Sequence, residues 1–360
     1  MLECEARGAP RLLAQPVGRR GRARPSRPGG HHRSHIAQRP APLQHPVARV
    51  AERAAPAPRS ARRGYVTDGP VLVTGGGGQL ASDLEDQLGR LGVEVHARAR
   101  SELDITDDRT VADTFARLRP TVVFNCAAFH NVDVCEGEED RAFEVNTRAV
   151  KRIAERCEAH GATLIHLSTN YVFDGSATEP YGELDRPSPR SVYAISKLGG
   201  EHAALAYAPG ALVVRTAGLY GRFGSASKGG NFVVRMIGRA REQRKLSVVA
   251  DQRLSPTYTT DLAAALIQAV DRGVNGLLHI TNGGDCSWYE FTRGILELAA
   301  IDVPLEPVAT VVPEGGADRP LNGVLARPRA DAAGLAELRP WRDALADYML
   351  SAGLTPAAAR

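Results

Sequence analysis

Lysine is scarce in this sequence, since only four of its 45 basic residues are lysines and the rest are arginines. The chain has no apolar run long enough for a membrane span, and its first residues lack the apolar core and cleavage site of a secretory leader. The five cysteines are odd in number and have no CxxC or Cys/His ligand spacing, which argues against a disulfide framework and a structural zinc site. We therefore expect a soluble protein of a reducing cytoplasm, with no membrane partner.

Residues 1–66 differ in composition from the rest of the chain. They contain fourteen arginines, nine prolines and three glutamates, and no hydrophobic period that could bury one face of a helix or strand. This composition predicts a disordered Arg/Pro-rich extension. A nucleic-acid-binding arm and a transit peptide are alternatives. No aromatic residue precedes Tyr65 to stack on a base, so we expect no nucleic-acid partner.

From Pro70 onward, short β-branched runs alternate with longer amphipathic segments. Strands are expected at 71–73, 93–95, 121–124, 163–167 and 212–214, and helices at about 79–90, 107–118, 139–159 and 190–207. This alternation implies βαβ units and predicts an α/β fold, a Rossmann-type doubly wound parallel sheet. Glycine-rich loops and helices near 231–243, 259–272 and 287–300 then predict a smaller C-terminal α/β lobe. We expect a nucleotide-binding domain at 69–215, interwoven with a substrate-binding lobe at 216–350.

Four glycines, from Gly75 to Gly78, follow the first expected strand and open the first helix. Glycines at this turn let the backbone approach a pyrophosphate, whose charge meets the free amides of the helix N-terminus. Near the end of the second strand, where an acidic residue often selects NAD, the chain has Arg98 and Arg100. Either could neutralise a 2′-phosphate, which favours NADPH and leaves NADH as the alternative. Asp104, slightly further on, either faces the adenine side or caps the next helix.

Tyr193 and Lys197 are four residues apart in an expected helix, so they share one face with a rise of roughly 6 Å. An ammonium beside a phenol lowers the pKa of the phenol, which can then give a proton to a carbonyl oxygen. The polar residues Ser168 and Thr169 end the preceding strand, where an open α/β sheet binds ligands. Either hydroxyl can donate a further hydrogen bond to the same oxygen, or serve only as a turn cap.

Several motifs follow one another along the chain. They are the glycine loop, 103–107, 126–133, 168–175, the Tyr193 and Lys197 pair, and 249–258. Over residues 69–345 the chain resembles the extended short-chain dehydrogenase/reductases, and within them the dTDP-4-dehydrorhamnose reductase family. The resemblance implies an oxidoreductase of nucleotide-sugar biosynthesis that reduces the 4-keto group of dTDP-4-dehydro-L-rhamnose with NADPH. Mg²⁺ is associated with this family, but no unambiguous ligand set is visible and we assign no metal residue.

The resemblance also implies roles for individual residues. The catalytic set would be Thr169, Tyr193 and Lys197. Cofactor contacts would come from Gly75, Gly78, Gln79, Leu80, Arg98, Asp104, Ile105, Ala127, Ala128, Phe129, Tyr193 and Lys197. The nucleotide-sugar would be held by Ser168, Thr169, Asn170, Arg215, Asn231, Phe232 and Arg319.

Two residues depart from the family pattern, and both lie on the sugar side. Asn170 replaces the usual aspartate, and Gly218 replaces the usual tryptophan. The cofactor chemistry is therefore better supported than the identity of the hexose. One alternative is a nucleotide-sugar epimerase or dehydratase, although a dehydratase would use an acid where this chain has Asn170. The other is a regulatory subunit without turnover, resembling the methionine adenosyltransferase beta subunit. The sequence leaves a homodimer open.

Overall fold

The computed structural model describes residues 65–223 and 230–356, all of which belong to the unit Gln44–Arg360. The predicted extension over residues 1–66 lies outside the described residues, except for Tyr65 and Val66, which begin the short 3-10 turn η1 (Tyr65–Thr67).

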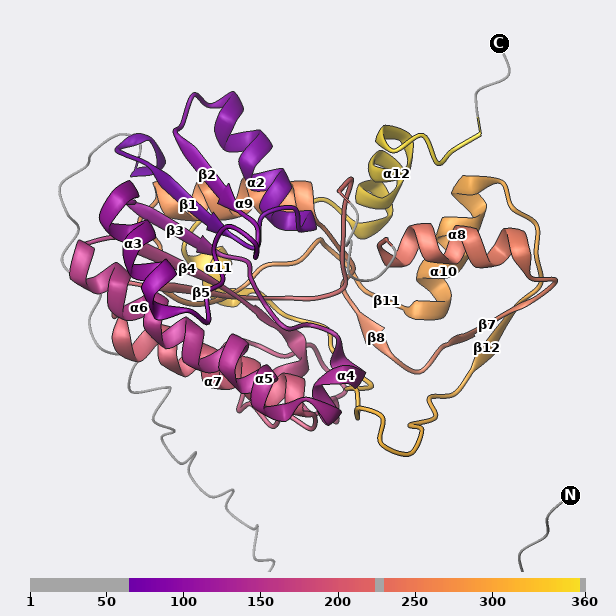
Figure 1. Cartoon of the computed structure of the whole chain (residues 1–360). Helices are drawn as coiled ribbons and strands as arrows, with labels where there is room; N and C mark the ends of the chain where they lie inside the picture. The colour runs from indigo at the N-terminus through magenta and orange to yellow at the C-terminus, as the bar shows by residue number, and fades with distance from the viewer. Residues whose placement is uncertain (1–64, 224–229, 357–360) are drawn as a thin grey trace, which may run out of the picture. The chain divides into compact units, whose positions relative to one another are not determined.

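A six-stranded parallel sheet forms the centre of the described chain, in the order β10-β5-β4-β3-β1-β2 (Figure 1). Its strands are β1 (Val71–Thr74), β2 (Val95–Arg98), β3 (Val122–Asn125), β4 (Thr163–Thr169), β5 (Leu212–Thr216) and β10 (Gly276–His279). The strand order reverses between β1 and β3, because the chain first moves outward to β2 and then returns past β1. The predicted α/β doubly wound fold is confirmed.

Helices cover both faces of this sheet, which explains why its central strands are apolar on both sides (Figure 1). One face packs against α2 (Gln79–Arg90), α9 (Thr259–Asp271) and the short α11 (Pro328–Ala332). The other face packs against α3 (Asp108–Leu118), α6 (Ala149–His160) and α7 (Val192–Tyr207). Helix α9 and strand β10 follow residue 216 in the sequence, yet they pack in the part built on the parallel sheet. The two expected domains, 69–215 and 216–350, therefore do not separate at residue 216.

A second apolar core gathers the remaining elements of the C-terminal part. Its helices are α8 (Phe232–Glu242), α10 (Trp288–Ala299) and α12 (Trp341–Ser351). Three short strand pairs accompany them: β6 (Leu219–Tyr220) with β9 (Thr257–Tyr258), β7 (Leu246–Val249) with β12 (Leu305–Val308), and β8 (Arg253–Leu254) with β11 (Cys286–Ser287). No described helix has the length and apolar character needed to cross a membrane.

The helix expected at 139–159 is interrupted. It consists of α5 (Glu139–Phe143), the π-helical turn η2 (Glu144–Arg148) and α6, with α4 (Val132–Gly137) before it. Within the wide turn, the buried Asn146 amide accepts from the Phe129 N–H and donates to the Phe129 carbonyl, both at 2.9 Å. A π turn often marks a functional position, and here it supports the loop that follows β3.

Candidate active site

The glycine loop between β1 and α2 adopts a backbone that other residues could not easily replace. Gly75 and Gly77 have φ of 76° and 78°, in the left-handed region. A Cβ on Gly75 would lie 2.9 Å from the Ala127 nitrogen, and one on Gly76 would lie 2.7 Å from the Arg98 carbonyl carbon. Gly78 caps α2 without a side chain, which leaves the first amides of α2 available to an anion.

Two buried polar atoms beside this loop have no partner among the described residues, namely Gln79 Oε1 and Arg98 Nε. Buried polar atoms are normally hydrogen-bonded, so these two indicate a ligand that supplies the missing partners. The loop, the bare helix N-terminus and the two orphaned atoms together fit a dinucleotide. Leu80 contributes only backbone here, because its side chain is buried in the core.

Arg98 lies against the glycine loop, whereas Arg100 does not. Arg98 ends β2 and its carbonyl accepts from the Gly76 N–H at 2.7 Å, while Nη1 lies 3.2 Å from Glu102 Oε1. Arg100 is mostly exposed and pairs with Asp104 at 3.3 Å. Burial acts to raise the pKa of Asp104, but hydrogen bonds from Thr106 and Arg100 outweigh it and hold the pKa below its usual value.

Asp104 does not cap the following helix, because Asp107 has that role and accepts from the Arg109 N–H at 3.0 Å. Asp104 instead closes the preceding turn through Thr106. The side chain of Ile105 is buried in the core against α3 and α6, so any contact with an adenosine would involve its backbone.

The loop after β3 brings Ala127, Ala128 and Phe129 to the carboxyl edge of the sheet. Ala127 lies against Gly75, as the close approach of a Gly75 Cβ shows. The ring of Phe129 lies under the Arg141 guanidinium, 4.5 Å from its centre. These three residues therefore extend the glycine loop toward β4, where the predicted catalytic residues begin.

Thr169 and Tyr193 meet, as the sequence predicts. Thr169 is the last residue of β4 and Tyr193 lies in the first turn of α7, close enough for the Thr169 hydroxyl to shift the pKa of the phenol. The Thr169 hydroxyl oxygen also accepts from the Tyr171 N–H at 3.2 Å and lies 3.3 Å from Asn170 Oδ1, so it caps the turn after β4 as well. Burial raises the pKa of the Tyr193 phenol, and the nearby Thr169 hydroxyl lowers it in part. The Tyr171 ring packs edge-on against the Tyr193 ring at 6.0 Å between centroids. The half-buried phenol thus stays protonated at neutral pH and can act as an acid.

Lys197 lies one turn further along α7 and is almost fully buried, at 3% exposure. Its Nζ donates to the Leu167 carbonyl at 2.5 Å and lies 3.5 Å from His166 Nε2. Burial lowers the pKa of this amine to about 8, against the opposing effects of Glu201 and Cys126. The sequence argument has Lys197 lowering the pKa of Tyr193, but burial dominates that phenol and Lys197 is not among the groups that shift it.

Ser168 does not face the same space as Thr169. Successive residues of a strand point to opposite faces, and the Ser168 hydroxyl donates to Glu201 Oε1 at 2.5 Å beneath α7. Arg215 binds the same carboxylate through two hydrogen bonds of 2.8 and 2.7 Å. Both side chains are thus hydrogen-bonded to Glu201, whereas the family resemblance implies that they hold the substrate.

Asn170 and Arg319 join the C-terminal segment to the end of β4. Asn170 Nδ2 donates to the Gly323 carbonyl at 3.0 Å, a bond that the family's usual aspartate could not donate. Arg319 pairs with Asp133 at 2.7 Å and donates to the Ala317 carbonyl at 3.3 Å, and the nearby Tyr171 acts to raise its pKa. Asp133 and Tyr171 therefore lie beside Arg319, one of the residues expected at the nucleotide-sugar. In the sequence, only their positions within the motifs 126–133 and 168–175 could have indicated that these two residues belong near the site.

Asn231 and Phe232, expected at the nucleotide-sugar, lie at the start of α8. Asn231 Oδ1 accepts from the Val234 N–H, and its amide hydrogens go to the Gly221 carbonyl at 2.8 Å and the Tyr348 hydroxyl at 2.7 Å. Both hydrogens are thus used within the protein. The Phe232 ring packs on Trp288 at 4.4 Å between centroids. Asn231 and Phe232 thus help to hold the second lobe together.

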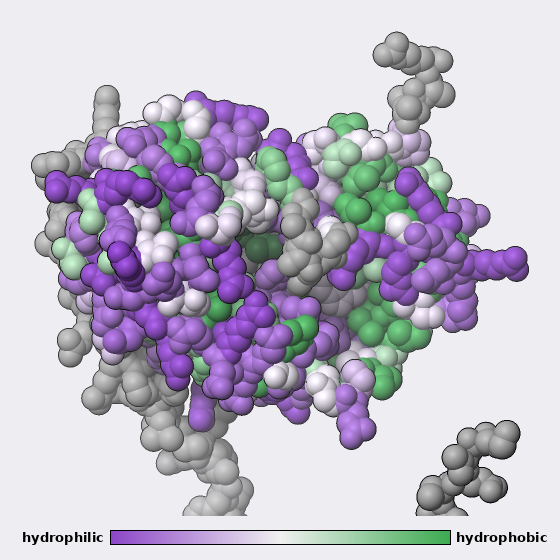
Figure 2. Space-filling model, in the orientation of Figure 1, coloured by the Kyte–Doolittle hydropathy of each residue, from purple (hydrophilic) through white to green (hydrophobic). Residues whose placement is uncertain are grey.

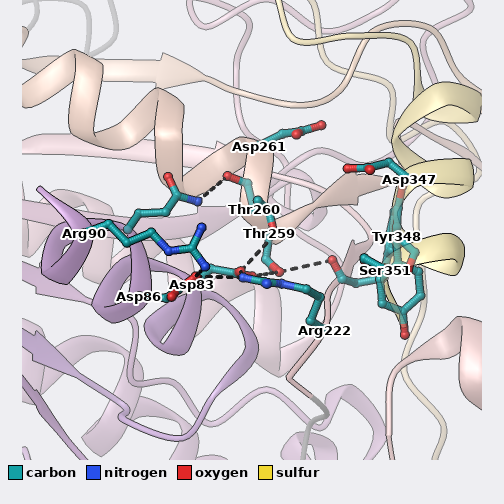
Figure 3. Close-up of polar contacts among 12 residues, drawn as sticks. Asp83, Asp86, Arg90, Arg222, Thr259, Thr260, Asp261, Asp347, Tyr348 and Ser351 are labelled. Atoms are coloured by element: carbon teal, nitrogen blue, oxygen red, sulfur yellow. Dashed lines mark hydrogen bonds and ion pairs between the residues drawn. The ribbon is translucent and has the colours of Figure 1, made fainter. Parts of the chain in front are cut away.

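A polar network ties this lobe to the helix of the glycine loop (Figure 3). Asp83 of α2 is fully buried and accepts from Thr259 Oγ1 at 2.6 Å and Thr260 Oγ1 at 2.8 Å, at the start of α9. Arg222, just after β6, reaches Asp83 at 3.2 Å and Asp86 at 2.9 Å (Figure 3). The carboxylate of Asp83 therefore fixes α2 relative to α9 and to the chain that leads into the second lobe.

The surface is hollowed between the part built on the parallel sheet and the part built on α8, α10 and α12 (Figure 2). A separate hollow of about 340 Å³ lies near the C-terminal segment and is lined by Gly175, Asp251, Arg253, Asp285 and Asn322 among others. Among the described residues, no three His, Cys, Asp or Glu side chains gather as a metal site.

Comparisons with known proteins agree with this geometry. Residues 69–353 match the family described as RmlD substrate binding domain. The chain belongs to this family. It is 39% identical over 279 residues to the spore coat polysaccharide biosynthesis protein SpsK of Bacillus subtilis, covering 78% of this chain and 96% of that protein.

Two further proteins carry the reductase name. The dTDP-4-dehydrorhamnose reductase of Streptomyces griseus is 41% identical, over 77% of this chain and 91% of that protein. The crystal structure of the Bacillus anthracis dTDP-4-dehydrorhamnose reductase in complex with NADP superposes with a TM-score of 0.74 at 33% identity, covering 79% of this chain and 99% of that one. The family resemblance read from the sequence is confirmed.

Proposed function

We propose that this member of the RmlD family reduces the 4-keto group of dTDP-4-dehydro-L-rhamnose to a hydroxyl, giving dTDP-L-rhamnose, with NADPH as reductant. The observation that carries the proposal is the proximity of the Thr169 hydroxyl to the Tyr193 phenol, with Lys197 one turn further along α7. The reductases named above give the substrate class.

The residues around the glycine loop fit NADPH. The loop and the first amides of α2 would hold the pyrophosphate, and Gln79 Oε1 and Arg98 Nε would gain the partners they lack within the described chain. Arg98 would meet the 2′-phosphate, and Lys197 would hold the nicotinamide ribose. When bound, the nicotinamide supplies the hydride for the carbonyl carbon.

The side chains of this protein then transfer the proton to the substrate. The Tyr193 phenol, protonated at neutral pH because burial raises its pKa, donates its proton to the carbonyl oxygen. The Thr169 hydroxyl orients that oxygen through a hydrogen bond, and solvent reprotonates Tyr193 after the product leaves. Positioned acids of this kind contribute about 10²–10⁴-fold to a rate.

The direct test is NADPH consumption with a panel of dTDP- and UDP-linked 4-keto sugars. We expect turnover with dTDP-4-dehydro-L-rhamnose and release of oxidised cofactor in each cycle. A purified protein that retains stoichiometric NAD through turnover would instead support the epimerase alternative. Cofactor binding without any reductase activity, together with co-purification of a synthetase, would support the regulatory alternative.

Arg98 should set the preference for NADPH over NADH. Because hydrogen bonds to charged groups contribute about 1.5–3 kcal/mol, Arg98→Ala should raise KM for NADPH by about 10-fold or more. KM for NADH should stay nearly constant, because NADH has no 2′-phosphate. Arg100→Ala is the matched control, since that exposed side chain should affect neither constant. An equal rise of KM for NADPH and for NADH in Arg98→Ala would contradict the assignment of Arg98 to the 2′-phosphate.

A further inference from the structure

A row of buried polar side chains crosses the sheet beneath the catalytic lysine. Thr74 of β1 is the register neighbour of Asn125 on β3, and Asn125 is the register neighbour of His166 on β4. All three are at most 1% exposed. Two residues earlier on each strand the same face is apolar, with Leu72, Val123 and Leu164. Polar groups are costly to bury in such a sheet unless they bond one another, so the row must be internally satisfied.

In the row of Thr74, Asn125 and His166, each side chain donates a hydrogen bond to the next one along. The Ala127 N–H donates to Thr74 Oγ1 at 3.3 Å, which leaves the Thr74 hydroxyl hydrogen for Asn125 Oδ1 at 2.7 Å. The Asn125 amide nitrogen then donates to His166 Nδ1 at 3.1 Å. Burial first, and the charge of Lys197 second, hold the pKa of His166 well below its usual value. The neutral ring, accepting at Nδ1, therefore carries its proton on Nε2.

Nε2 of His166 points at the amine of Lys197, 3.5 Å away. Helix α7 can lie this close because residue 200 is glycine. A Cβ there would be 3.1 Å from His166 Nε2 and 2.2 Å from the Asn146 carbonyl oxygen. The Lys197 amine is thus held between an N–H group and the Leu167 carbonyl that accepts from it.

We propose that His166 is a positioning residue for Lys197, because the Thr74 and Asn125 row fixes its tautomer and directs its Nε2–H at the lysine amine. An N–H donor at this place accommodates the lone pair of a neutral amine and disfavours an ammonium. The inference adds to the proposed function, since it depends on that function only for what Lys197 does in turnover.

The charged and titratable groups around Lys197 are consistent with this role. Burial lowers the pKa of Lys197 to about 8, while Glu201, on the same helix, and the Cys126 thiol, after β3, act to raise it. Glu201 is already bound by Arg215 of β5, which weakens its attraction for the ammonium. Burial also raises the pKa of the Cys126 thiol to about 12, so that thiol carries no charge near neutral pH.

Thr74→Val tests the row without adding a charge. Without the Thr74 hydroxyl hydrogen, the Asn125 amide is free to turn its oxygen to His166 Nδ1, and Nε2 then accepts from the Lys197 ammonium. The pKa of Lys197 should rise by about half a unit or more. Because the chain has only four lysines, ¹³Cε-lysine NMR of the full chain resolves this titration, with Lys197→Met for assignment. The control is Thr163→Val, at the other end of β4.

Asn125→Asp is the second variant. A carboxylate at this position accepts from the imidazole Nδ1–H, so the pKa of Lys197 should rise by about one unit or more. The alkaline limb of the kcat profile should move with it, while KM for NADPH changes little. If the Lys197 titration stays within about 0.2 units of the wild type in both variants, the row has only a structural role and the proposal is wrong. The NMR titration needs no turnover, so a failure of the proposed reductase activity would be seen separately.

Discussion

Replacing Tyr193 with phenylalanine is expected to lower kcat by about 10²–10⁴-fold, because the variant has no acid to protonate the carbonyl oxygen. The effect should fall on kcat and on kcat/KM alike, since the proton is transferred only in the transition state. NADPH oxidation by the variant at saturating sugar measures it. The ring and its edge-on contact with Tyr171 are kept, so the cofactor affinity should hold.

Tyr171→Phe is the matched control for this measurement. It removes a hydroxyl from the adjacent ring, beside Arg319, but it leaves the acid in place. We expect a smaller loss, in KM for the sugar more than in kcat. Unchanged turnover in Tyr193→Phe would show that another group delivers the proton.

Arg215→Met is expected to lower the free energy of unfolding by about 3–5 kcal/mol, because it leaves the Glu201 carboxylate buried without its counter-ion. The two side chains are only 1% and 4% exposed and are joined at 2.7 Å. The measurement is urea denaturation of the purified protein. The double variant Arg215→Met with Glu201→Met should recover much of the loss, since it removes both charges.

The exposed pair Lys245 and Glu306 provides the control. The Lys245 Nζ lies 2.7 Å from Glu306 Oε2, but each side chain is about half exposed. Lys245→Met should therefore change the stability by only about 0–1 kcal/mol. An Arg215→Met variant of normal stability with a raised KM for the sugar would contradict this account, and would return Arg215 to the substrate-binding role implied by the family resemblance.

The fold could be predicted from the sequence because each of its signals is local. Strands buried on both faces appear as short apolar runs, and the helices between them have an amphipathic period. The glycine loop and the spacing of Tyr193 and Lys197 are equally local, and the structure keeps both on the expected elements. The expected strand 93–95 differs, since β2 spans Val95–Arg98. Helix 139–159 differs as well, since nothing local reveals that Asn146 opens a π turn to hold Phe129.

Several side chains expected on the sugar side make contacts in the fold that the sequence could not show. Whether Asn170 touches a substrate or the Gly323 carbonyl depends on a contact between residues far apart in the sequence. Arg215 was assigned to the nucleotide-sugar by family position, whereas the tertiary fold brings Glu201 against it. Ser168 could have been separated from Thr169 by the alternation of side chains along a strand.

The electrostatics of the site also required the structure. The sequence places an amine one helical turn from a phenol, which suggests that the amine lowers the pKa of the phenol. In the fold, burial raises the pKa of Tyr193 and lowers that of Lys197. The row of Thr74, Asn125 and His166 exists only through strand register, which no single segment of sequence contains.

The most direct measurement of the central claim is isotope transfer from NADPH deuterated at nicotinamide C4 to dTDP-4-dehydro-L-rhamnose. The account predicts deuterium at C4 of the product sugar, seen by NMR, with one oxidised cofactor released for each sugar reduced. A product without deuterium at C4, or a cofactor that returns to its starting redox state while bound, would contradict it.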